Sequence, residues 1–117
     1  MKPTIIAKGV KLSRTLREYV ARRLRFALNR TQHSIQTVTV RINDQNGPKG
    51  GLDKCCQIQL SLPGQPNIII TEKASDITTA VDQAAHRAAL AVGRLHERTK
   101  AIVHAKYNVV PIEPAMN

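Results

Sequence analysis

Apolar residues recur with helical spacing across residues 76–100, the longest regular pattern in the chain. They follow the i, i+3, i+4 rule of a helix that buries one face. Half of them are alanine, so the helix axis can lie close to its neighbour, and a flat sheet is the partner that best accepts this approach. Either Ser75 or Asp76 can cap the N-terminus. The stripe consists of Ile77, Ala80, Val81, Ala84, Ala88, Ala91, Val92 and Leu95.

A second helical stripe begins at Leu12 and predicts a helix over residues 13–29. Ser13 is a suitable N-cap, and Leu12 before it can act as a hydrophobic staple. The spacing predicts a helix whose other side faces solvent. The stripe is formed by Leu12, Leu16, Val20, Leu24 and Ala27.

Four further segments have the alternating or compact apolar pattern of β-strands. They are Thr4–Lys8, 35–42, 54–62 and 67–73. The element order is therefore β-α-β-β-β-α, an α+β fold with a four-stranded sheet. A helical crossover makes the first two strands parallel, and hairpins make the remaining pairs antiparallel. We expect both helices to pack side by side on one face, and the polar strand residues to form an open face.

The length of the chain predicts one domain, because 117 residues can bury one core but hardly two. We expect residues 1–104 to form this domain and residues 105–117 to form a C-terminal tail. The tail is either disordered or supplies Val109 and Val110 to a partner surface. No apolar run is long enough to cross a membrane, and the N-terminus lacks the apolar segment of a signal peptide, so a cytoplasmic location is expected.

The chain is strongly basic: 18 Lys and Arg against 8 Asp and Glu give a formal net charge of +10. A small domain of this charge is attracted to polyanions, of which nucleic acid is the commonest and an acidic membrane surface the second. The membrane is disfavoured because the apolar stripes are needed to cover the sheet. Tyr19, Phe26 and Tyr107, the only aromatic residues, do not repeat along a strand. Contacts with phosphates and helix shape are therefore expected, rather than base readout.

Arginines gather on both predicted helices. Arg87, Arg94 and Arg98 share one flank of the 76–100 stripe, because spacings of seven and four residues stack side chains along a helix. If the helices pack side by side, the two groups of arginines could share one surface; a merely solubilising face is the alternative for the first helix. The candidates on that helix are Arg14, Arg17, Arg22 and Arg25, and Lys49 in the glycine-rich loop of residues 43–53 is a further candidate.

No catalytic or metal site is predicted. Cys55 and Cys56 are adjacent, and neighbours on a strand point to opposite faces, so we expect reduced thiols that share no metal. The four histidines show no ligand spacing. Asp82 and His86 could meet as an acid–base pair, but we expect them on the exposed side of the helix, without a second carboxylate or a nucleophile. The expectation is a protein without enzymatic activity, cofactor or small-molecule substrate.

Four short motifs resemble a known family in their order and spacing. They are Lys8-Gly9-Val10, Leu16-Arg17-Glu18-Tyr19-Val20, Leu62-Pro63-Gly64 and Ala80-Val81-Asp82. Together they are similar to the ribosome hibernation promoting factors and ribosome-associated inhibitor A, in the sigma-54 modulation protein family, over residues 4–100. The resemblance implies a fold related to double-stranded RNA-binding domains. It also implies a protein that sits in the mRNA and tRNA channel of the small ribosomal subunit, contacts rRNA through basic helix residues, and stops translation in starved or stationary cells.

Carried over by position, Arg87, Arg94 and Arg98 match places where the family usually has Lys or Arg in its last helix. Arg17 matches the arginine of the first-helix signature. The chain departs from the family pattern at three positions of the last helix, where an aromatic or a basic residue is common, and its loop of residues 43–53 looks longer than usual. The three departures are Thr78, Leu90 and His96.

The leading hypothesis is a non-catalytic RNA-binding protein that blocks the decoding channel of the small subunit by competing with tRNA and mRNA. The alternative is an interaction protein on the same fold, which binds an acidic protein partner through the open sheet face or the tail. Dimerisation of ribosomes through the additional C-terminal domain of the long family forms is not expected, because the chain lacks that domain.

Overall fold

The computed structural model describes residues 2–44 and 53–107, and describes side chains as far as Leu95. Lys49, most of the loop of residues 43–53 and the end of the predicted tail lie outside the described residues. The side chain of Arg98 does so as well, although its backbone belongs to the last helix.

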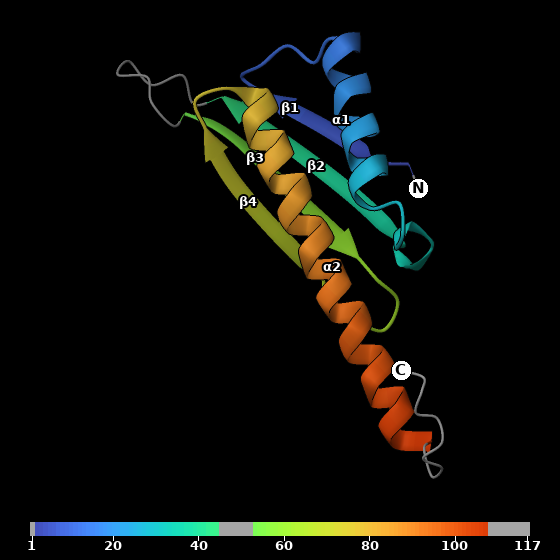
Figure 1. Ribbon diagram of the computed structural model, residues 1–117. Helices are drawn as coiled ribbons and strands as arrows, with labels where there is room; N and C mark the ends of the chain where they lie inside the picture. The colour runs from blue at the N-terminus through green and yellow to red at the C-terminus, as the bar shows by residue number, and fades with distance from the viewer. Residues whose placement is uncertain (1, 45–52, 108–117) are drawn as a thin grey trace.

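A four-stranded sheet forms one layer of the molecule (Figure 1). Its strands β1 (Thr4–Lys8), β2 (Thr37–Asp44), β3 (Lys54–Ser61) and β4 (Ile68–Ala74) lie in chain order. β1 pairs with β2 in parallel and the other two pairs are antiparallel, as predicted. β2 begins later than its pattern suggested, because a turn of 3-10 helix at Gln32–Ser34 precedes it.

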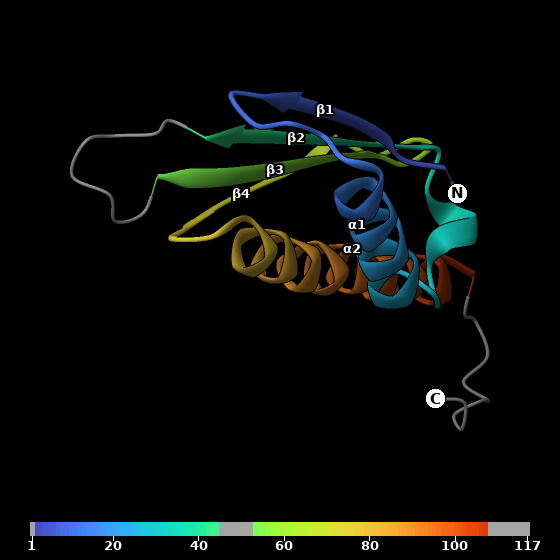
Figure 2. The same ribbon diagram turned by 90° about the horizontal axis from the view of Figure 1, so that it is seen from above.

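Two helices cover the same face of the sheet (Figures 1 and 2). α1 (Arg14–Ala27) lies over β1 and β2, and α2 (Ile77–Tyr107) runs across β3 and β4. The hydroxyl of Ser13 accepts a hydrogen bond from the Leu16 amide at 3.1 Å and caps α1, as predicted. α2 continues beyond its predicted end because no proline interrupts it.

The core between the two layers is apolar throughout the described residues. Ala84 and Ala88 of α2 are 0% exposed, so small side chains let this helix lie close to β3 and β4, as predicted. Ala85 is equally buried, although the sequence pattern omitted it. The large side chains that are fully buried are Leu24, Leu28, Ile42, Ile58, Leu60, Val20, Val40, Val81 and Val92.

The connection from β1 to α1 requires a glycine. Gly9 has a φ of 76°, a left-handed conformation that residues with a Cβ rarely adopt. A Cβ at this position would lie 2.7 Å from the carbonyl oxygen of Asp44, at the end of β2. The chain therefore turns towards α1 in close contact with the neighbouring strand.

Asp76, rather than Ser75, caps α2. Its carboxylate accepts hydrogen bonds from the Thr79 amide at 3.0 Å, the Thr79 hydroxyl at 2.7 Å and the Thr78 hydroxyl at 2.6 Å. The hydrogen bonds from Thr78 and Thr79 lower the pKa of Asp76 from 3.8 to about 2. Thr78, one of the three departures from the resemblance described above, thus supports the cap in this chain.

The Asp76 cap predicts a stability that depends on pH. Because its pKa is lower in the folded protein, the stabilisation is fully present above the unfolded pKa of 3.8 and is lost as the pH falls towards about 2. Asp76→Asn keeps a capping oxygen without the charge. Urea unfolding followed by circular dichroism should therefore show wild type to be more stable than Asp76→Asn at pH 6, with a difference that shrinks between these two pKa values. A difference independent of pH would contradict this explanation.

Candidate nucleic-acid interface

Helix α1 presents a basic side to solvent. Arg14, Arg17, Arg22 and Arg25 are all exposed. Arg14 donates to Glu18 at 3.3 Å, a pair typical of exposed i, i+4 positions. The other three arginines form no ion pair with any residue in the described part of the chain. Their positive charges are therefore available to an external anion.

These arginines do not all lie on the same side of α1. Successive residues of a helix are rotated by about 100°. Arg14, Arg17 and Arg25 consequently lie on the side away from Tyr19 and Arg23, which contact α2. Arg22 lies between the two sides, on the surface of the helical layer.

A hydrogen-bonded cluster joins α1 to α2. The Tyr19 hydroxyl donates to Asp82 Oδ1 at 2.5 Å, and Arg23 Nε donates to the same oxygen at 3.1 Å. The hydrogen bond to Asp82, assisted by burial, raises the pKa of Tyr19. Asp82 was expected on the exposed side of its helix as a surface partner of His86. The Asp82 carboxylate is indeed 43% exposed, but its partners are two side chains of α1, Tyr19 and Arg23.

Arg87 lies on the opposite flank of α2. It donates to the carboxylate of Glu72 and, at 3.4 Å, to the carbonyl oxygen of Thr71, both on β4. Arg94, seven residues further along the same flank, is exposed. α1 contacts one flank of α2 and Arg87 the other, so the structure does not bring Arg87 onto a common surface with the α1 arginines. Its charge is also partly compensated by Glu72.

The base of the loop of residues 43–53 holds a basic residue that the sequence analysis did not single out. Lys54 Nζ donates to Asp44 Oδ1 at 3.2 Å and to Asp53 Oδ1 at 3.3 Å. The hydrogen bond to Asp44, together with that to Asp53, raises the pKa of Lys54. This lysine is therefore engaged within the protein, whereas Lys49 lies outside the described residues.

The open face of the sheet carries a second group of cations. The strand register aligns Lys8, Asn43, Cys55 and Lys73 in one row across the four strands. The adjacent row contains Arg41 and, like the rest of this face in β1 to β4, has no Asp or Glu. From the sequence, only Arg41 was expected on this face. Lys8 and Lys73 join it because the register of the four strands brings these two residues into one row.

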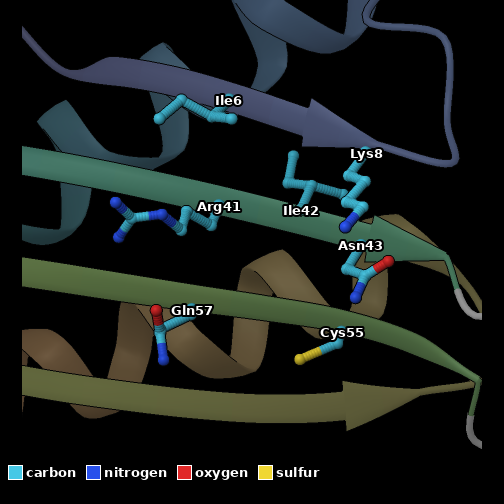
Figure 3. Close-up of a pocket in the computed structure, with 7 residues that line it drawn as sticks. All are labelled: Ile6, Lys8, Arg41, Ile42, Asn43, Cys55 and Gln57. Carbon is cyan, nitrogen blue, oxygen red and sulfur yellow. The ribbon is translucent and has the colours of Figure 1, made fainter.

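A shallow hollow of about 300 Å³ lies on this open face (Figure 3). Arg41 and Gln57 lie across β2 and β3, while Cys55 and Asn43 lie further along the same strands. Cys55 is half-buried, and its neighbour Cys56 points into the core, as predicted. Burial raises the pKa of the Cys56 thiol to about 12, so this thiol stays protonated at neutral pH.

The helical layer has a hollow of its own, of about 340 Å³, lined by Tyr19, Arg22, Arg23 and Phe26. Within the described residues, no cluster of His, Cys, Asp or Glu could hold a metal ion. None of the described helices is both long and apolar enough to span a membrane. The hollow of the helical layer is thus lined by two guanidinium groups and two aromatic rings.

Comparison with known proteins agrees with this architecture. The chain superposes on the N-terminal domain of Thermus thermophilus Protein Y with a TM-score of 0.64 and 22% identity, covering 79% of this chain and 94% of that one. It superposes on a ribosomal subunit interface protein from Coxiella burnetii with a TM-score of 0.67 and 21% identity, covering 83% and 99%. These similarities show the α+β fold.

A sequence search of curated proteins finds no match. The family model for sigma 54 modulation protein / S30EA ribosomal protein, in contrast, matches residues 4–100. The matched residues include all four strands, the whole of α1, and α2 as far as Lys100. The chain therefore belongs to the sigma 54 modulation protein / S30EA ribosomal protein family.

Proposed function

We propose that this protein is a non-catalytic translation inhibitor that binds the small ribosomal subunit in the cytoplasm and occupies its mRNA and tRNA channel. The observation that carries the proposal is the set of exposed α1 arginines without an ion-pair partner in the described structure: Arg17, Arg22 and Arg25. Family membership supports a ribosome as the partner, since the family description names a ribosomal protein and a structural neighbour is named a ribosomal subunit interface protein.

The mechanism follows from the charge of the helical layer. Guanidinium groups form bidentate hydrogen bonds with phosphate oxygens, and neutralised phosphates release their counterions. The α1 arginines and Arg94 lead this contact, while Arg87, which is engaged with Glu72, contributes less. Arg98 and Lys49 remain candidates by their positions in the sequence. Inhibition results from exclusion, because the bound protein and tRNA cannot occupy the same channel.

A second candidate function is binding of an acidic protein partner through the open sheet face. It is favoured by the cations on that face, Lys8, Arg41 and Lys73, and by the absence of acidic residues among its described positions. Under this alternative, binding would not require RNA.

Sedimentation of purified small ribosomal subunits with the protein over a salt series tests the proposal. Wild type should pellet with the subunits, and the log of its affinity should fall linearly with log salt, by about 0.7 to 0.9 per phosphate contact. Subunits preloaded with mRNA and tRNA should bind it more weakly. Failure of wild type to pellet at low salt would refute the proposal, as would undiminished binding to the preloaded subunits. Co-purification of a protein from nuclease-treated lysate would instead favour the alternative.

A further inference from the structure

Phe26 is the most exposed large apolar side chain among the described residues. Its side chain lies in the last turn of α1 and is 79% exposed, compared with 57% for Ile69 on the open sheet face. It contributes nothing to the core. An aromatic ring in this position, among arginines, has no role in holding the fold together.

Phe26 belongs to a stripe of α1 that includes the two residues in contact with α2. Tyr19, Arg22, Arg23 and Phe26 are spaced i, i+3, i+4, i+7, so they are neighbours on the surface of α1, with Arg22 nearest to solvent, and they line the hollow of about 340 Å³. Hydrogen bonds from Tyr19 and Arg23 to Asp82 join this part of α1 to α2. The residues that line the hollow all belong to α1, and two of them contact α2.

Small residues lie on the side of α2 that carries Asp82. Ala89 and Gly93 follow Asp82 by seven and eleven residues, which returns each of them to nearly the same side of the helix. A Cβ built at Gly93 would meet no atom within 4 Å apart from its chain neighbours and the backbone of its own helix. The flank of α2 that contacts α1 therefore carries no bulky side chain at these two positions.

The charge of the hollow selects the kind of group that it can bind. Arg22 is exposed and has no ion-pair partner in the described structure, while Arg23 is held by Asp82. A hydrophobic protein segment would leave the Arg22 guanidinium without a counter-charge. A nucleotide suits both the exposed ring of Phe26 and the guanidinium of Arg22. Its base can stack on the ring, and its phosphate can accept hydrogen bonds from the guanidinium.

We propose that the hollow formed by Tyr19, Arg22, Arg23 and Phe26 binds one unpaired nucleotide of RNA, with the base stacked on Phe26 and the phosphate on Arg22. Tyr19 and Arg23 position the stripe through Asp82 and do not need to contact the base. The inference rests on the proposed function for the source of the RNA. It adds to that function a contact with a single unstacked base, beyond contacts with the phosphate backbone.

The first test uses Phe26→Trp, because the chain contains no tryptophan and the emission of the one introduced indole can be excited apart from that of the tyrosines. Titration with a short single-stranded RNA oligonucleotide should quench the fluorescence, since stacked bases quench tryptophan. Inorganic polyphosphate, which carries the charge without bases, should bind without this quenching. Equal responses to the two polyanions, or no response to RNA, would overturn the proposal.

The second test compares Phe26→Leu with Phe26→Trp in sedimentation with small ribosomal subunits. Leu keeps an apolar side chain but removes the ring, so affinity should fall roughly 5-fold or more, whereas Trp should retain it. Neither change alters the salt dependence, because no charge is removed. If Phe26→Leu bound small ribosomal subunits as tightly as wild type does, stacking on Phe26 would be contradicted, although the proposed ribosome binding would stand. Quenching by RNA in a protein that does not pellet with subunits would support the nucleotide site and refute the ribosomal assignment instead.

Discussion

Replacing Arg17, Arg22 and Arg25 together by alanine is expected to weaken binding to small ribosomal subunits by roughly 100- to 1000-fold at about 0.1 M salt. Each uncompensated arginine that contacts a phosphate releases a counterion, so the loss of three contacts should also flatten the slope of log affinity against log salt by about two to three units. The three side chains are exposed, so the melting temperature should stay unchanged. Sedimentation over a salt series measures both quantities.

The matched control removes the same number of charges from the other layer. Lys8→Ala, Arg41→Ala and Lys73→Ala together lower the net charge equally but act on the open sheet face. This variant should lose much less affinity if the helical layer contacts the RNA. An equal or larger loss in the sheet-face variant would place the contact on the sheet and contradict the proposed orientation.

Ala88→Leu is expected to lower the free energy of unfolding by about 3 kcal/mol. Ala88 is 0% exposed in the face of α2 that packs on the sheet, and it belongs to the buried apolar core. A larger side chain must therefore push α2 away from β3 and β4 or adopt a strained rotamer. Urea denaturation followed by circular dichroism measures the change.

Gln83→Leu provides the control for this substitution. Gln83 is exposed on the outer side of the same helix, so the new side chain meets solvent and the stability should change by less than about 0.5 kcal/mol. If Ala88→Leu were tolerated as well as Gln83→Leu, close packing of α2 on the sheet would not be the reason for its alanines.

The fold was predictable from the sequence because its local signals agree with one another. Strand alternation identified the inward side chains of β2 and β3, and the helical period identified the buried faces of α1 and α2. The caps at Ser13 and Asp76 also follow from residue type, since each has a short side chain with an oxygen acceptor. Such signals depend on residues that are close together in the chain.

The site was less predictable because it depends on contacts between distant segments. The periodicity placed Arg87 on one flank of α2, but it could not show that this flank faces Glu72 while the other flank faces α1. Asp82 looked like a solvated residue for the same reason. Phe26 and Lys73 were not singled out, because the exposure of Phe26 and the place of Lys73 in the cationic row of the sheet are set by the tertiary structure.

The cluster at Asp82 has a consequence for the entropy of binding. By joining Tyr19 and Arg23 to α2, it fixes α1 relative to the second helix before any partner arrives. Association then needs to immobilise only the ends of the basic side chains, at roughly 0.5 to 1.5 kcal/mol each, and not the helix that carries them. The protein therefore meets its partner with the charge pattern of its helical layer already arranged.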